Sequence, residues 1–338
     1  MFALRLAGQD AETQIRSEVD RIEHSLRENT IADIRSKANT EELMKQVRDA
    51  TAQHRVFQSL EYLAELHSFL GGVRNSVEES GSPAFDARWA RVNGDLTTLL
   101  RQVRNTNWNQ AQNGLRALAE SALGTVGPLL SGSRGFAESG SVADGLFYLG
   151  QAQGEGEFAK FCASLNLVRT GRAISARSIL PELLTLQEKV NAAFVPPRSI
   201  EQHSRFIALN ATLKMARELD AAGSHAGALY QYLDAVRLYG LFDASGLDDS
   251  SKKELKEKVG ALRTQLTSSK NDDSVAAIFV ERAESLIAGA ANAEEWRAAS
   301  VIAGQVIPAY FDARKPSAGT VRPPHKTVQL TLVRWPFT

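Results

Sequence analysis

Residues 206–242 carry the clearest hydrophobic pattern in the chain. Apolar side chains recur at helical spacing on both sides of a short turn at 222–224. The apolar positions are Leu209, Leu213, Ala216 and Leu219 before the turn, and Ala228, Tyr232, Ala235, Val236 and Tyr239 after it. Gly223 lies where a helix C-terminus favours a residue that tolerates positive φ. The pattern predicts two antiparallel helices that pack against each other.

Helical periodicity also governs the N-terminal part. A seam of Ile15, Val19, Ile22 and Leu26 predicts a long charged helix over 10–38. Asn39 and Glu42 have the spacing of a capping box, which predicts that a second long helix begins there and reaches Val73. Two further helices are expected over 84–104 and 108–130.

The segment 131–141, SGSRGFAESGS, is the richest Gly/Ser run of the chain. Such a run predicts a linker or a mobile surface loop. We therefore divide the chain into an N-terminal extension over 1–9, a long-helix bundle over 10–130, this linker, a helical-hairpin part over 142–315 and a C-terminal segment over 316–338.

Shorter helices are expected after this linker. Gly154 and Gly156 predict a turn between two of them, and others are expected over 172–194 and 274–289. Further capping boxes are predicted at Ser199 with Gln202, Ser251 with Glu254, and Asn292 with Glu295, the last of which opens a helix that ends near 308–311. The fold class is therefore all-α, with about ten helices in antiparallel hairpins.

The 206–242 hairpin resembles a tetratricopeptide-type repeat. Its second helix carries Ala228, Tyr232 and Ala235, which match the small–aromatic–Ala signature of that family. The first helix departs from the family, with Thr212, Met215, Ala216 and Leu219 where Trp, Leu, Gly and Tyr are usual, and Gly240 replaces the terminal Pro. The resemblance covers this one hairpin. It implies a repeat-like helical scaffold and carries over no catalytic residue.

Composition limits the classes of partner and compartment. Lys+Arg and Asp+Glu are both 39 in the 338 residues, so no overall positive field favours nucleic acid. No run approaches the ~18 apolar residues of a membrane span. The single cysteine, Cys162, lies on an apolar helix and is expected to be a buried core residue. Cytoplasm and periplasm both fit, and residues 1–9 fit a native start or a signal remnant.

Candidate chemical motifs are few. Gly154-x-Gly156-x-x-Ala159 fits a loose dinucleotide fingerprint, but no strand precedes it. Ser250-x-x-Lys253 has the spacing of a catalytic Ser–Lys pair. It lies at a predicted helix start, however, where serine commonly caps the helix N-terminus. The six histidines form no zinc or di-iron helix motif. We expect no catalytic residue, no cofactor and no metal site.

In the C-terminal segment the spacing of apolar residues changes from the helical period to the alternation of a strand. After a Pro-rich stretch, 326–334 alternates apolar and polar side chains, which predicts a strand ending in two aromatics. The candidate partner-binding residues are Val328, Leu330, Leu332, Trp335 and Phe337. This strand could pair with a partner or a second copy, with the alternating FALRL at 2–6, or remain an apolar tail without regular structure. We slightly favour the partner, because a two-stranded ribbon alone is marginal in water.

The function expected from these patterns is a non-enzymatic, protein-binding or scaffolding protein that takes a protein or peptide into a helical-repeat groove. Two alternatives stay open. One is a structural subunit docked through its C-terminal strand, including as a homo-oligomer. The other is a small-ligand carrier or enzyme with a pocket in the helical core.

Overall fold

The computed structural model describes residues 2–28, 34–76, 82–169, 171–174, 176–193, 200–242, 246–290 and 292–315. Most of these residues are helical, and the described part contains no β-strand, which confirms the all-α prediction. The helices are α1 (Phe2–Glu28), α2 (Ile34–Ala52), α3 (Val56–Ser76), α4 (Ser82–Arg104), α5 (Asn113–Glu138), α6 (Val142–Ser164), α7 (Leu180–Ala193), α8 (Ile200–Ala221), α9 (His225–Gly240), α10 (Asp249–Ser268), α11 (Ser274–Gly289), α12 (Ala293–Val301) and α13 (Ile307–Ala313).

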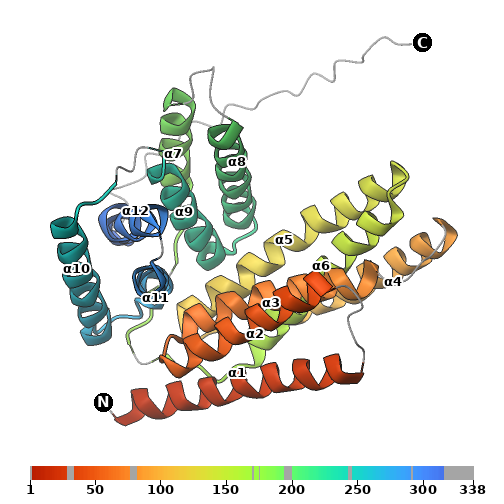
Figure 1. Cartoon of the computed structure of the whole chain (residues 1–338), viewed down its shortest axis with the longest axis horizontal. Helices are drawn as coiled ribbons and strands as arrows, with labels where there is room; N and C mark the ends of the chain where they lie inside the picture. The colour runs from red at the N-terminus through yellow and green to blue at the C-terminus, as the bar shows by residue number, and fades with distance from the viewer. Residues whose placement is uncertain are drawn as a thin grey trace.

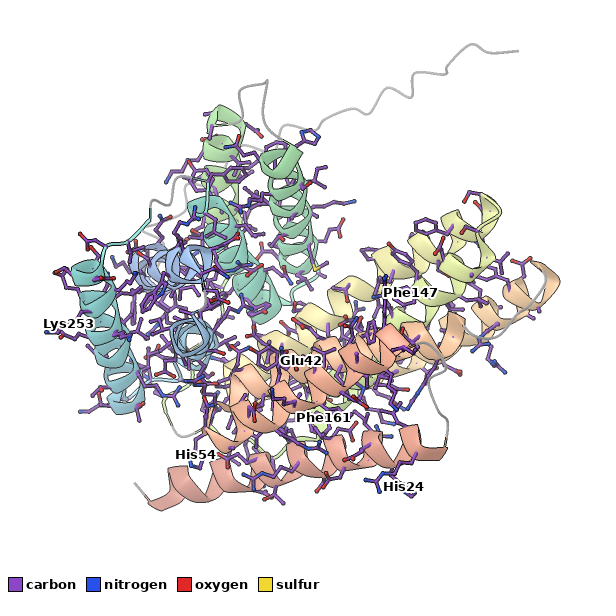
Figure 2. The ribbon with its side chains drawn as sticks, in the orientation of Figure 1. His24, Glu42, His54, Phe147, Phe161 and Lys253 are labelled. Atoms are coloured by element: carbon purple, nitrogen blue, oxygen red, sulfur yellow. The ribbon has the colours of Figure 1, made fainter. Side chains whose placement is uncertain are left out.

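The first six helices form an elongated up-and-down bundle (Figure 1). Helix α6 lies at its centre and packs against α3, α4 and α5. Gly71 of α3 meets Gly150 of α6, and His67 meets Gly154, so these two helices run antiparallel. Helices α1 and α2 pack against α3 on its other side. Side chains fill the space between the ribbons, and Phe147 of α6 covers Gly72 of α3 (Figure 2).

Helix α6 corrects the expected turn at Gly154 and Gly156. Both glycines lie inside one continuous helix, and both are buried. Glycine normally weakens a helix interior, by roughly 1 kcal/mol relative to alanine. Here the missing side chains leave room for neighbours, because the backbone of α3 approaches Gly154 and Leu96 of α4 packs on Gly156. Packing against several neighbouring helices therefore stabilises one continuous helix where the sequence predicted two helices joined by a turn.

Helices α7 to α13 form the second part, stacked on one end of the bundle (Figure 1). The predicted hairpin is confirmed as α8 and α9, and Gly223 in its turn has φ +78°. The hairpin packs on α5, where the side chain of Leu219 lies against Gly124. Helix α11, confirmed over the predicted residues 274–289, contacts α10, α12, α3 and α5.

The final helix continues past its predicted end. Helix α12 begins at the predicted capping box of Asn292 and Glu295 and leads through a π-helical turn, Ile302–Val306, into α13. Pro308 lies inside this continuous helix. Proline offers no N–H to the carbonyl four residues earlier, and a π-turn shifts that hydrogen-bond ladder. The π-turn therefore accommodates Pro308 within the helix. Because α12, the π-turn and α13 form one continuous helix, the described residues hold twelve helices.

Other predicted boundaries were wrong. Asn39 lies inside α2, and the predicted long helix over 39–73 is broken at 53–55 between α2 and α3. Residues 131–138 are the last turns of α5 rather than a linker or loop, and only 139–141 turn. Helix α7 starts at Leu180, because 171–174 and 176–179 are not helical. Residues 2–6 are helical, which excludes the predicted pairing of FALRL as a strand.

Several helix N-termini are capped by side chains that lie far away in the sequence. Acidic side chains from distant parts of the chain accept hydrogen bonds from the first backbone N–H groups of four helices, which otherwise lack intrahelical partners. The acceptors are Glu281 for Phe57 and Gln58 of α3 (2.8 and 3.1 Å), Asp272 for Asn113 of α5 (2.7 Å), Asp220 for Ile179 before α7 (3.1 Å) and Glu120 for Gly227 of α9 (2.8 Å). The caps of α3, α5 and α9 join the bundle to the second part, and Asp220 of α8 joins the start of α7 within the second part.

Candidate functional site

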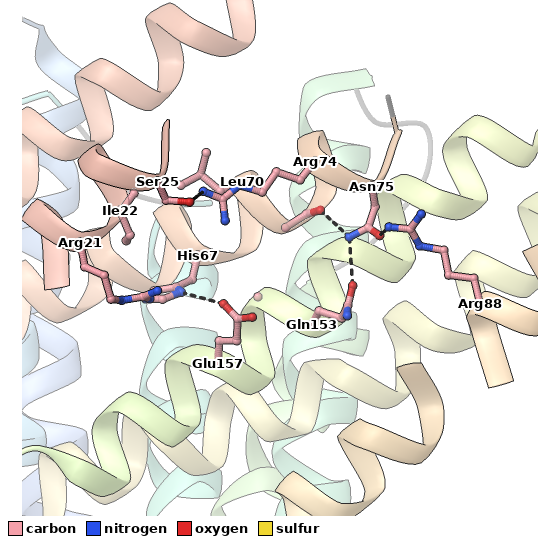
Figure 3. A pocket seen from close by; sticks show the side chains of 12 residues that line it. Arg21, Ile22, Ser25, His67, Leu70, Arg74, Asn75, Arg88, Gln153 and Glu157 are labelled. Atoms are coloured by element: carbon pink, nitrogen blue, oxygen red, sulfur yellow. Dashed lines mark hydrogen bonds and ion pairs between the residues drawn. The ribbon is translucent and has the colours of Figure 1, made fainter. Parts of the chain in front are cut away.

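A polar cavity of about 210 Å³ opens between α1, α3, α4 and α6. It lies beside the point where Gly71 and Gly154 let α3 and α6 come together. Its lining residues are Arg21, Ile22, Ser25, His67, Leu70, Gly71, Arg74, Asn75, Arg88, Gln153, Gly154 and Glu157 (Figure 3). Three arginines from three different helices therefore surround one small space.

His67 lies in the inner wall of this cavity between two carboxylates. Its Nε2 is 3.1 Å from Glu18 of α1, and its Nδ1 is 3.7 Å from Glu157 of α6. Burial alone would lower the pKa of His67, but the hydrogen bonds and charges of Glu157 and Glu18 outweigh burial and raise it. The imidazole ring is only 4% exposed, so it joins three helices through a partly buried ionic contact.

Glu18 is the carboxyl group next to His67 whose pKa is lowered to about 2. Burial raises the pKa of Glu18, yet hydrogen bonds from Arg21 and His67 outweigh that effect and lower the pKa to about 2. Arg21 meets Glu18 through two of its nitrogens, at 2.8 and 2.5 Å. Glu18 is therefore ionised at any ordinary pH, and its charge is shared between Arg21 and His67.

Neutral amides form the other wall. Asn75 donates to the carbonyl oxygen of Gly71 at 2.9 Å and to Oε1 of Gln153 at 3.0 Å, and its Oδ1 accepts a hydrogen bond from Arg88 of α4 (Figure 3). Burial and the neighbouring charge of Arg91 lower the pKa of Arg88. Arg74 donates to Ser25 of α1 at 3.1 Å. The wall thus presents guanidinium and amide donors.

Sequence reasoning identified none of the polar residues of this cavity; it assigned Ile22 to an apolar helix seam and Gly154 to a turn. Glu18 and His67 stand 49 positions apart, and Glu157 comes 90 positions after His67. No local spacing connects them. The available signal was the pair of glycines in α3 and those in α6, since small residues on two helices mark a close crossing.

A second buried polar network joins α3, α9 and α11. Arg282 lies between Glu61 and Asp234, and it donates to Asp234 at 2.8 Å and to the Tyr230 hydroxyl at 3.0 Å. The Tyr230 hydroxyl in turn donates to Glu61 at 2.8 Å. Arg237 also donates to Asp234 at 2.8 Å, so two guanidinium groups match the two carboxylates, and the network joins the hairpin to the bundle.

The other residues singled out from the sequence have structural places. Cys162 is buried, as predicted, and burial raises the pKa of its thiol. Helix α10 begins one position before Ser250, and its N-cap is Asp248, which accepts from the Ser251 N–H at 2.8 Å in place of the predicted Ser251 cap. The candidate residues Val328, Leu330, Leu332, Trp335 and Phe337 lie outside the described residues, as does Ser199.

An exposed apolar face marks α7 and α8. Leu180 and Leu184, one helical turn apart on α7, are 46% and 49% exposed, and Ile207 on α8 is 58% exposed. The last described residue, Lys315, lies close to the start of α7, because its carbonyl oxygen accepts a hydrogen bond from Arg177 at 3.3 Å. The described part of the chain therefore ends close to the start of α7.

Comparison with known proteins assigns the chain to no group. No protein family matches it, and neither does any curated protein or solved structure. Within the described residues, no three His, Cys, Asp or Glu side chains cluster so that they could hold a metal ion. No helix in that part of the chain combines the length and the apolar character needed to cross a membrane.

Proposed function

We propose that this protein is a non-enzymatic, protein-binding scaffold that docks a protein partner on α7 and on its C-terminal segment. The observation that carries the proposal is the hydrogen bond between Arg177 and Lys315, beside the exposed Leu180 and Leu184. It places Lys315, which precedes the Pro-rich stretch and the predicted strand over 326–334, beside the start of α7. A partner with an open strand edge and an adjoining apolar surface would engage both.

The α8–α9 hairpin supports a repeat-like scaffold as the finer form of this proposal. Ala228 and Ala235, which carry the tetratricopeptide resemblance, are fully buried, and the hairpin packs on α5 through Glu120 and Gly227. Helical hairpins that stack in this way commonly present surfaces for peptides or partner helices. In this chain the adjoining α7 supplies the exposed apolar side chains.

The test compares four forms of the protein as bait in chemical cross-linking, followed by reconstitution with the purified captured protein. They are the full chain, a chain ending at Lys315, Leu184→Asp, and the matched control Thr185→Asp. The control adds the same charge at the neighbouring exposed position. We expect the full chain and the control to bind the same protein, and the other two forms to lose at least tenfold in affinity.

Two results would refute the docking proposal. In the first, the truncated chain and Leu184→Asp bind the partner as well as the full chain does. In the second, the truncated chain loses its helical circular dichroism, because the segment then belongs to the fold itself. Light scattering on the same samples tests whether the partner is a second copy of this chain. A full-chain dimer, or larger oligomer, that becomes monomeric on truncation would make the tail a contact between copies.

The small-ligand alternative also has a specific observation in its favour, the cavity at His67. Its lining of arginines, amides and a carboxylate differs from that of an apolar peptide site.

A further inference from the structure

The charges around the cavity do not cancel. When His67 is protonated, the two cations His67 and Arg21 are balanced by the two carboxylates Glu18 and Glu157, which are their partners. Arg74 makes no ion pair within this set, although its charge also helps to lower the pKa of Glu157. Its hydrogen-bond partner in the described structure is Ser25, a neutral hydroxyl group. The cavity therefore holds a guanidinium group whose hydrogen bond goes to an uncharged oxygen.

Hydrogen-bond donors also exceed acceptors in this wall. The guanidinium of Arg74 has five N–H donors and Ser25 takes one contact. The Oε1 atom of Gln153 accepts from Asn75, and its amide nitrogen has no partner within the described part of the chain. The Oδ1 atom of Asn75 is already taken by Arg88. The one carboxylate among the lining residues, Glu157, is directed to His67, so Arg74 and the Gln153 amide make no hydrogen bond to a charged acceptor in the described structure.

We propose that this cavity binds a small oxyanion group, a phosphate or a carboxylate, with Arg74 as its principal ligand and the Gln153 amide as a second donor. Arg74 and Gln153 come from α3 and α6, so such a ligand would bridge the helices that cross at Gly71 and Gly150. Guanidinium groups recognise both kinds of oxyanion through paired N–H donors.

The dimensions agree with this ligand. The cavity volume of about 210 Å³ is several times the ~30 Å³ that one water molecule occupies in the liquid. An oxyanion group therefore fits together with a few waters, whereas a large cofactor does not. Arg74 is exposed, so the ligand can enter from solvent without opening the bundle.

This inference goes beyond the scaffold function and involves none of the residues of α7 or of the C-terminal segment. The two proposals can therefore fail separately.

The test is isothermal titration of the full-length protein at pH 6 with inorganic phosphate and, in a separate arm, with acetate. Sodium chloride at matched ionic strength is the reference for general screening. We expect saturable binding of at least one oxyanion, and none of chloride. Saturation with phosphate alone assigns a phosphate-type ligand, and saturation with acetate alone assigns a carboxylate.

Two variants locate the site. Arg74→Gln removes the unbalanced charge and should weaken binding at least tenfold. Gln153→Glu keeps the acceptor oxygen for Asn75 while it places a negative charge in the wall, and should weaken binding at least as much. The control Arg101→Gln removes an exposed arginine of α4 outside the cavity and should bind like the unchanged protein. Circular dichroism melting verifies that each variant is folded.

The proposal is overturned if phosphate and acetate give no more heat than chloride at equal ionic strength. It is also overturned if folded Arg74→Gln and Gln153→Glu both bind like the Arg101→Gln control, because the anion then binds elsewhere on the surface.

Discussion

Gly71 of α3 and Gly150 of α6 bring the backbones of their helices into direct contact. A Cβ atom added to either residue would overlap the carbonyl group of the other. One helical turn further on, Gly154 meets the backbone of His67 in the same way. The two helices therefore cross with no side chain between them. This close approach positions His67 beside Glu157 and forms the inner end of the cavity.

This crossing predicts a large effect of a single methyl group. Gly71→Ala or Gly150→Ala would force the helices apart and should destabilise the protein by about 1–3 kcal/mol or more, the cost of overpacking a dense core. Gly94→Ala is the matched control, because Gly94 lies in α4 with open space where a Cβ would stand. Alanine there should be neutral or stabilise by up to ~1 kcal/mol. Urea unfolding of the three variants measures the difference, and equal stabilities would contradict the crossing.

The ionic contact at His67 predicts a stability maximum on the acid side of neutrality. The pKa of His67 is raised above its usual 6.5, so its contribution is complete below 6.5 and is lost as pH rises through the raised value. The pKa of Glu18 is lowered from 4.5 to about 2, so its contribution is complete above 4.5 and is lost as pH falls towards 2. Thermal melts across pH should show the greatest stability between those limits.

Several charged groups surround His67, so a variant of His67 is needed to assign the pH dependence to this residue. It faces Glu18 and Arg21 of α1 and Glu155 and Glu157 of α6, with Arg74 on its own helix. His67→Gln should cost roughly 1–3 kcal/mol at pH 6, the scale of one charge-assisted hydrogen bond. It should also reduce the loss of stability above 6.5, and the loss that remains up to about 7 belongs to Glu281 and Glu155, whose pKa values burial raises to about 7. An unchanged profile in His67→Gln would assign the pH dependence to other groups.

Glu281 provides a separate test of the caps between distant segments. It accepts from Phe57 and Gln58 and pairs with Arg263 at 3.0 Å. Glu281→Ala should destabilise by about 0.5–2 kcal/mol, as for other lost N-caps. Glu281→Gln keeps an acceptor oxygen for the N–H groups and should lose less. If the two variants melt at the same temperature, the cap does not hold α3 to α11.

The same residue predicts a distinct pH effect. Burial raises the pKa of Glu281 from 4.5 to about 7, even though Arg263 and the backbone N–H groups act in the opposite direction. The folded state therefore binds this proton more tightly than the unfolded state, and stability falls as pH rises from 4.5 to about 7. Glu281→Gln should flatten this part of the profile, and a slope that stays the same would refute the assignment.

The hairpin itself can be tested at Ala228, which is fully buried in the α8–α9 pair. Ala228→Leu should overpack that contact and cost roughly 1–3 kcal/mol. Ala87→Leu adds the same side chain on an exposed position of α4 and should leave the midpoint of unfolding unchanged. Denaturant midpoints of the two variants give the comparison, and equal midpoints would show that the hairpin is not packed at Ala228.

Local sequence determined the helical class, because apolar periodicity and caps act within one or two turns. The α8–α9 hairpin, the Gly223 turn, helix α11 and the Asn292 capping box were all predictable for that reason. Glycine runs misled the same reasoning. Gly154, Gly156 and the residues 131–138 look like turns in isolation, yet they are helical because packing on neighbouring helices outweighs their weak intrinsic preference.

Tertiary structure alone decided the rest. The cavity gathers Arg21, His67 and Arg74 with Glu157 from three helices, and the cap of α3 comes from Glu281, more than 200 positions away in sequence. No spacing rule reaches such pairs, because they depend on which helices cross and how closely. In this protein that is decided at Gly71 and Gly150, where the absence of two side chains brings distant charges within reach of one another.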